Sequence, residues 1–85
     1  MIDIIIPTYN RHESIERIIN DLSNQSDQDF TVNIIDQSET AFVNKINTKF
    51  IVNIYWQPNI RSPILARNYG LKKTNSDIIL FLDDD

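Results

Sequence analysis

The chain alternates between short apolar runs and stretches with helical periodicity, and this alternation constrains its fold more than any other feature. Apolar runs rich in β-branched residues occupy Ile2–Ile6, Phe30–Asp36, Ile51–Trp56 and Ile78–Leu82, and Pro7 stops the first of them. Short apolar runs that end in polar residues or breakers are typical of strands. The last run is apolar throughout, which predicts a strand buried on both faces of a parallel sheet.

The segment after the first run carries the pattern of an amphipathic helix. Its apolar residues recur at the spacing of one helix face, at Ile15, Ile18, Ile19 and Leu22. This spacing predicts a helix from about Arg11 to about Ser23. Asn10 and Glu13 are placed to form a capping box at its start, and His12 is expected to be a surface residue.

Two further helices are predicted later in the chain. Ser62 followed by Pro63 is typical of an N-cap and a first helical residue, and predicts a helix that runs to about Lys73. Its inward-facing residues are predicted to be Ile64, Leu65 and Leu71. A weaker pattern predicts a short helix between the second and third strands, with Phe42, Val43, Ile46 and Phe50 as its apolar residues.

Strands that alternate with helices predict an α/β fold with a parallel sheet and right-handed crossovers. In such folds ligands bind beyond the carboxyl ends of the strands, near a point where the strand order reverses. The polar clusters of this chain follow its predicted strands, at Pro7–Asn10, Asp36, Asn59 and Asp83–Asp85. We therefore expect a ligand site at this edge of the sheet.

Length and composition exclude several classes of protein. The 85 residues have room for one small domain, and the net charge of −4 argues against a nucleic-acid-binding surface. With no Cys and one His, disulfide scaffolds and zinc sites built from Cys or several His are excluded. Gly70 is the only glycine, so a glycine-rich dinucleotide turn, a P-loop and a Gly-x-Ser-x-Gly elbow are excluded as well.

No apolar run approaches the roughly 20 residues of a membrane-spanning helix. The N-terminus lacks the basic and long apolar regions of a signal peptide. The expected location is therefore cytoplasmic.

The strongest sign of chemistry is the run Asp83, Asp84 and Asp85, directly after the most apolar strand. Three neighbouring carboxylates repel one another unless a cation neutralises them. Hard divalent cations such as Mg²⁺ or Mn²⁺ favour oxygen ligands and often bind phosphate as well. The alternative is a solvated acidic tail, since charge runs are usually solvated. The position after a buried strand favours a metal–phosphate site.

Other candidates are ambiguous when each is taken alone. Asp36 at a strand end is more often a turn or cap residue than a ligand contact, and Asn59 has an equally good interpretation as a turn residue. Tyr9 alone is more often a partly buried aromatic than a platform for a base. Arg67 alone is more often a solvent-facing helix residue. Tyr9, Asp36 and Asn59 become candidates because each ends or follows a predicted strand, at the edge of the sheet where ligands bind.

Four blocks of the sequence together resemble the family 2 glycosyltransferases with the A-type fold. Ile4–Arg11 is similar to the opening strand of that family, and Ile34–Asp36 to its second strand with a terminal Asp. Ala66–Leu71 resembles its Ala-Arg-Asn-x-Gly helix. Ser76–Asp85 resembles the strand that leads into its DxD motif. The resemblance covers the whole chain, with all four blocks in the family's order.

This resemblance implies a fold and the base side of a nucleotide-sugar site. The fold is a Rossmann-like three-layer α/β/α arrangement, with a four-stranded parallel sheet of order 3-2-1-4 and helices on both faces. Pro7, Thr8 and Tyr9 match the loop around the nucleotide base. Asp36 matches the acid that reads the base, which is typically uracil in this family.

The resemblance also implies the diphosphate side of the site. Asn59 and Arg67 match polar contacts at the edge of the nucleotide pocket. Asp83 matches the first acid of the DxD motif, and Asp84 takes its variable position and could help to bind the donor. Asp85 matches the last acid, which holds the divalent metal, Mn²⁺ or Mg²⁺. The metal would act as a Lewis acid as the leaving group departs.

The chain departs from the family's pattern at two loops. The family often has Asp-Asp-Gly-Ser after the second strand, where this chain has Asp36-Gln37-Ser38-Glu39. The loop after the third strand often carries a glycine where this chain has Arg61. The first departure changes the groups near the base, and the second changes the conformations open to the loop, because Arg does not tolerate positive φ as Gly does.

The family's reaction is transfer of a sugar from a nucleotide diphosphate, here expected to be UDP, to an acceptor hydroxyl, with inversion. The acceptor, a saccharide, a lipid or a protein, is not specified by the sequence. Family members continue past the acidic motif, into the part that supplies the acceptor site and the general base. We therefore expect residues 1–85 to be the nucleotide-sugar-binding N-terminal half of a longer enzyme, which could associate with a membrane. Alone it is expected to be inactive, with no catalytic residue.

Two alternatives to this interpretation stay open at the level of sequence. One is a nucleotide- or metal-binding module without catalysis. The other is a receiver-type α/β domain with an acidic Mg²⁺ pocket, which needs a separate nucleophilic Asp and usually a Lys after a later strand. In the half-domain that the resemblance implies, apolar surface left uncovered by a missing helix layer is a candidate site of self-association.

Overall fold

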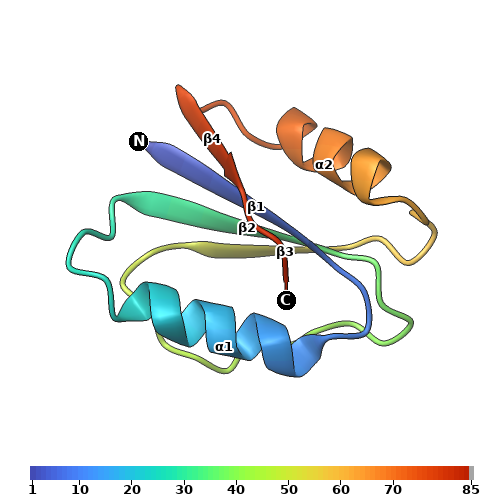
Figure 1. Ribbon diagram of the computed structural model, residues 1–85, viewed down its shortest axis with the longest axis horizontal. Coiled ribbons are helices and arrows are strands. Elements are labelled where there is room, and N and C mark those ends of the chain that lie inside the picture. Colours follow the sequence, from blue (N-terminus) through green and yellow to red (C-terminus); the bar gives the residue numbers. More distant parts are fainter. Residues whose placement is uncertain (85) are drawn as a thin grey trace.

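The computed structural model describes residues 1–84 and contains a four-stranded parallel sheet with a helix on each face (Figure 1). The sheet has the order β3-β2-β1-β4, which confirms the predicted order. The elements are β1 (Ile2–Thr8), α1 (His12–Ser23), β2 (Phe30–Asp36), β3 (Val52–Trp56), α2 (Pro63–Lys72) and β4 (Ile78–Phe81).

The register of the sheet brings the carboxyl ends of its two central strands level. Strand β1 pairs with β2 from Ile2 opposite Phe30 to Thr8 opposite Asp36. Strand β4 pairs with the first part of β1, and the Leu82 backbone N–H still donates to the Ile5 carbonyl at 3.0 Å. The acids after β4 therefore run beside the last residues of β1.

Each face of the sheet has its own core. The face that α1 covers buries Ile4, Ile6 and Val32 against Ile15 and Ile19 of the helix. The face that α2 covers buries a smaller cluster of Ile5, Ile35 and Ala66. Figure 1 shows the two helices on opposite sides of the strands, which confirms the predicted layers.

Helix α2 packs on the sheet through its small residues. Ala66 and Gly70 are its buried positions, and a Cβ added to Gly70 would lie 2.8 Å from Cγ2 of Ile5. The prediction that the large apolar residues of this helix face inward was therefore wrong. Their exposed fractions are 67% for Ile64, 56% for Leu65 and 43% for Leu71. Because Ile5 already fills this face of β1, only small residues allow the helix to approach.

Two other predictions about elements were wrong. No helix forms between residues 42 and 50, although Phe42 and Phe50 are buried against the α1 side of the sheet. The last strand lies at the edge of the sheet, as the predicted order requires, but it is not buried on both faces: Ile78, Leu80 and Phe81 are 51%, 46% and 43% exposed.

The start of α1 also differs from the prediction. Arg11 is the N-cap residue, and no side chain caps the helix there, so the predicted capping box does not form. Asn10 instead adopts a positive φ of 53° before the helix begins. His12 is partly buried, with its ring edge against Phe42 at 5.4 Å between centroids, where a surface position was expected.

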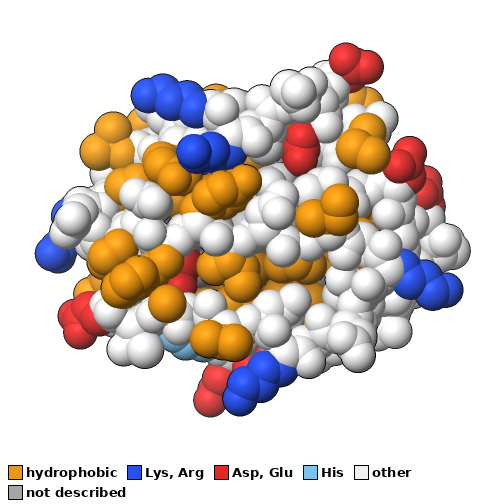
Figure 2. Space-filling view, turned by 180° about the vertical axis from the view of Figure 1, so that it is seen from behind, with side chains coloured by type: hydrophobic (Ala, Val, Ile, Leu, Met, Phe, Trp, Pro, Cys, Tyr) orange, Lys and Arg blue, Asp and Glu red, His pale blue; other side chains and the backbone are white. Residues whose placement is uncertain are grey.

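Much apolar surface remains exposed. Figure 2 shows hydrophobic side chains across the middle of the face opposite to Figure 1, with charged groups mostly toward its rim. Trp56, Val43 and Ile51 are among the exposed large residues of the chain. Within residues 1–84, no helix has the length and apolar character that crossing a membrane requires.

Candidate functional site

A cavity of about 260 Å³ opens at the carboxyl ends of β1 and β4. It joins the loop after β1, the start of α2 and the acids after β4, as the topology of parallel sheets predicts. The residues that line it are Pro7, Thr8, Tyr9, Arg11, Gln37, Pro63, Arg67, Asp83 and Asp84.

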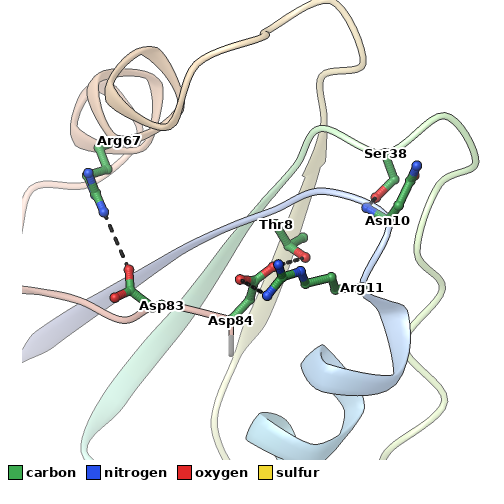
Figure 3. A network of polar contacts seen from close by, with 7 residues as sticks. All are labelled: Thr8, Asn10, Arg11, Ser38, Arg67, Asp83 and Asp84. Carbon is green, nitrogen blue, oxygen red and sulfur yellow. Dashed lines mark hydrogen bonds and ion pairs between the residues drawn. The ribbon is translucent and has the colours of Figure 1, made fainter.

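Asp84 is fixed at the floor of this cavity by two partners. The Thr8 hydroxyl donates to its Oδ2 at 2.9 Å, and Nη1 of Arg11 lies 3.6 Å from its Oδ1 (Figure 3). The Asp84 side chain is only 17% exposed. One carboxylate oxygen is therefore held by the end of β1 and the other by the start of α1.

Asp83 points to the opposite wall. Its Oδ1 lies 3.5 Å from Nη2 of Arg67 on α2, and its side chain is 76% exposed. Figure 3 shows the two neighbouring carboxylates turned away from each other, each toward a different arginine. This arrangement separates like charges and balances two acids with two guanidinium groups.

Asp36 lies opposite Thr8 at the end of β2 and is completely buried. Its Oδ1 accepts from the Ser38 backbone N–H at 3.1 Å, and its Oδ2 accepts from the Phe42 backbone N–H at 2.6 Å. A buried carboxylate is stable where such donors replace its water. The side chain therefore shapes the loop that follows β2.

Ser38 ties this loop to both neighbouring strand ends. Its hydroxyl oxygen accepts from the Asn10 backbone N–H at 2.7 Å (Figure 3), and its carbonyl accepts from Nε1 of Trp56 at 2.9 Å. The Asn10 side chain in turn accepts from the Glu39 backbone N–H at 3.2 Å. These bonds hold Asn10 at its positive φ, and so fix the backbone next to Tyr9.

A second hollow of about 490 Å³ shares part of the same wall. It is lined by Tyr9, Gln37, Ile60, Arg61 and Pro63, and the Tyr9 side chain is half exposed beside it. The Gln37 amide donates to the Ile60 carbonyl at 2.9 Å. The carboxylate that the family often has at this position could not donate this hydrogen bond. Gln37 therefore links the β3–α2 loop to the end of β2 in a way that the family's usual residue cannot.

The structure brings most of the predicted site residues together. Six of them line the first cavity: Pro7, Thr8, Tyr9, Arg67, Asp83 and Asp84. The buried Asp36 and the exposed Asn59 line neither this cavity nor the second hollow. Asp85, the predicted metal ligand, lies outside the described residues.

Three lining residues were missed by the sequence analysis: Arg11, Gln37 and Pro63. Arg11 is the last residue of the block Ile4–Arg11 that resembles the family, and Gln37 directly follows Asp36. Their sequence positions were clear, but nothing in the sequence indicated that their side chains face the site.

The donor atoms at the acidic edge suit a hard divalent cation. Asp83 and Asp84 offer carboxylate oxygens, the ligand type that Mg²⁺ and Mn²⁺ favour. Residues 1–84 contain no group of three or more Asp, Glu, His or Cys side chains close enough to hold a metal. The carboxylates of Asp83 and Asp84 are chemically suitable ligands for such an ion. In this structure Asp83 is paired with Arg67 and Asp84 with Arg11.

Comparison with known proteins gives a consistent picture. The family model described as glycosyl transferase family 2 matches residues 3–85. Two proteins of Haemophilus influenzae named uncharacterized glycosyltransferases are 31% and 36% identical over the whole chain, which spans 29% and 36% of their lengths. A poly(ribitol-phosphate) β-N-acetylglucosaminyltransferase of Staphylococcus aureus is 29% identical over 96% of the chain and 16% of its own length. No solved structure matches the chain.

Proposed function

The chain belongs to glycosyl transferase family 2, and on that premise we propose that it binds the nucleotide-diphosphate sugar donor of a glycosyltransferase. The observation that carries this proposal is the cavity at the carboxyl ends of β1 and β4. An exposed aromatic ring, two arginines and two carboxylates line it together. These are the groups that a base, a diphosphate and a divalent cation require.

The base would lie against Tyr9, where an aromatic face can stack on it. Pro7 and Thr8 complete the loop on this side, and the neighbouring apolar hollow adds Ile60 and Pro63 as walls. Uracil is the base that we propose. Direct reading of the base by Asp36 and a contact from Asn59 remain predictions, and Asp36 orders the loop after β2 through its bonds to the Ser38 and Phe42 backbone.

The diphosphate would lie between Arg67 and the acidic edge. A guanidinium group binds phosphate oxygens through paired, charge-assisted hydrogen bonds. Asp83, Asp84 and Asp85 are the residues that would hold Mn²⁺ or Mg²⁺ beside it. When bound, such an ion stabilises the negative charge that develops on the leaving diphosphate.

We propose that the full reaction transfers the sugar to an acceptor hydroxyl with inversion at the anomeric carbon. The chain spans about a third or less of the length of the relatives it matches. The acceptor site and the general base would come from further residues of a longer protein. The 85 residues alone would bind the donor without transferring its sugar.

Titration calorimetry with UDP, with and without Mn²⁺, tests this proposal. Wild type should bind UDP more tightly with Mn²⁺, and Asp84→Asn should lose that gain. Asp77→Asn is a matched control, because Asp77 is exposed and lies outside the cavity lining. Failure of wild type to bind UDP under either condition would contradict the proposed donor site. A UDP affinity that changes neither with Mn²⁺ nor with the Asp84→Asn substitution would support a base pocket and refute the role of the acids.

A further inference from the structure

We infer that Arg11 is a donor-binding residue, and that its exchange from Asp84 to the donor couples diphosphate binding to cation binding. Before the donor binds, its guanidinium acts as the counter-ion of Asp84. When a diphosphate enters, Arg11 turns to the phosphate oxygens and leaves the carboxylate to the cation. This inference rests on the proposed function and adds a residue and a coupling to it.

The geometry makes Arg11 a partner that can leave. Its Nη1 lies 3.6 Å from Oδ1 of Asp84, and its side chain is 52% exposed. The contact is long and its arginine end is exposed, so the ion pair is worth about 1 kcal/mol and a more strongly attracting anion can draw Arg11 away from Asp84. The Thr8 hydroxyl holds the other oxygen of Asp84 at 2.9 Å, so the carboxylate keeps its place when Arg11 moves.

Arg67 differs from Arg11 in how it is held. It lies on the opposite wall, on α2, with its guanidinium carbon 6.0 Å from the centroid of the Phe81 ring and its Nη2 3.5 Å from Asp83. The Arg67 side chain is 37% exposed, less than that of Arg11. Arg11 is also the N-cap residue of α1, but its side chain makes no capping hydrogen bond. The side chain can therefore rotate without breaking a bond that holds the helix.

Arg11 and a divalent cation therefore compete for one carboxylate. Both are cations, and Oδ1 of Asp84 is the oxygen that Arg11 faces. A diphosphate that attracts Arg11 removes this competitor, and the cation then binds more tightly. Because such coupling is reciprocal, the cation must strengthen diphosphate binding by the same factor.

Arg11→Gln isolates this competition, and Arg17→Gln is its matched control. Arg17 lies on the same helix and is exposed, and among the described residues it forms no ion pair and does not line the cavity. Both variants remove one positive charge, so a general effect of charge on cation binding appears in both. Far-UV circular dichroism and thermal melts verify that each variant folds like wild type.

The experiment measures binding of Mn²⁺ alone by electron paramagnetic resonance of the free ion, and binding of UDP by calorimetry with and without Mn²⁺. Arg11→Gln should bind Mn²⁺ alone about two- to fivefold more tightly than Arg17→Gln, as removal of a weak competing ion pair implies. It should bind UDP alone more weakly than Arg17→Gln. The factor by which UDP and Mn²⁺ strengthen each other should fall from its wild-type value toward one.

Each other outcome overturns a defined part of the account. Equal Mn²⁺ affinity in the two variants would refute the competition at Asp84. The proposed function would still stand in that case if the wild-type chain binds UDP with Mn²⁺. Tighter Mn²⁺ binding with unchanged UDP affinity and coupling would refute the exchange. A wild-type chain that binds Mn²⁺ but no UDP would overturn both the proposed function and this inference.

Discussion

Asp36→Asn is the substitution that most sharply tests what holds the loop after β2 in place. The side chain keeps its shape, but one acceptor oxygen becomes an NH₂ group. In the wild-type chain both oxygens accept backbone N–H groups, from Ser38 at 3.1 Å and from Phe42 at 2.6 Å. The new NH₂ group must therefore face a donor, in a position that water does not reach.

The cost follows from these two contacts. A hydrogen bond to a charged group contributes about 1.5–3 kcal/mol, and a buried donor left without a partner costs about 1–3 kcal/mol. Removal of a buried charge offsets part of this loss, because the carboxylate no longer has to be desolvated. The expected net loss is about 2–4 kcal/mol, a large part of the stability of about 5–10 kcal/mol that a small domain has.

Urea denaturation measures this loss. For a chain of this size an m-value of about 1–1.5 kcal/mol/M converts the loss into a midpoint lower by about 2 M. Trp56 reports on the loop itself, because its indole N–H donates to the Ser38 carbonyl. Asp29→Asn makes the same charge change at an exposed position and should leave the midpoint almost unchanged. Equal midpoints for the two variants would refute this reasoning.

Three further substitutions test other parts of the structure. Gly70→Ala should lower stability in urea by about 1–2 kcal/mol, because overpacking against Ile5 exceeds the gain in helix propensity; greater stability would contradict the close approach of α2. Asn10→Val should lower the free energy of unfolding in the same assay by about 1–2 kcal/mol more than Asn10→Gly does, because a β-branched residue is strained at the positive φ of this position. Equal losses would argue against a positive φ at residue 10. Tyr9→Ala should weaken UDP binding about tenfold or more in calorimetry, while Tyr9→Phe should not; equal losses would refute stacking.

The sheet could be predicted from the sequence because its signals are local. Each strand is a short apolar run with a marked end, and alternation with helices leaves few topologies. Helix α2 shows where local signals fail. Its large apolar residues suggested an inward face, but the helix approaches the sheet only through Ala66 and Gly70, since Ile5 occupies the space between. That constraint comes from β1, far away in the sequence.

The segment before β3 and strand β4 illustrate the same limit. Phe42 and Phe50 are buried, as their apolar character predicts, but the segment that contains them is irregular and not helical. Both rings reach the core without the regular spacing of a helix. The apolar run of β4 predicted burial on both faces, yet Ile78, Leu80 and Phe81 are each 43% or more exposed. Apolar composition indicates a tendency to be covered and does not say what covers it.

The site was predictable in position and only partly in detail. Residues that follow strands in a parallel sheet must meet at one edge, so the meeting of Tyr9 and Asp83 followed from topology, whereas Arg67 was a candidate only through the resemblance of its helix to the family's. The pairing of Arg11 with Asp84 depends on side-chain direction at the start of α1, which no spacing rule gives. The burial of Asp36 likewise depends on the path of the loop after β2.

The most direct test of the central claim is to map where UDP contacts the chain. Amide resonances followed in a proton–nitrogen correlation spectrum, with UDP and Mg²⁺ added, report the site residue by residue. The account predicts shifts concentrated at Thr8, Tyr9 and Arg67, in the cavity at the ends of β1 and β4. Shifts centred instead on Glu13 and Thr40, in the open hollow of about 500 Å³ at the start of α1, or no shifts at all, would contradict it.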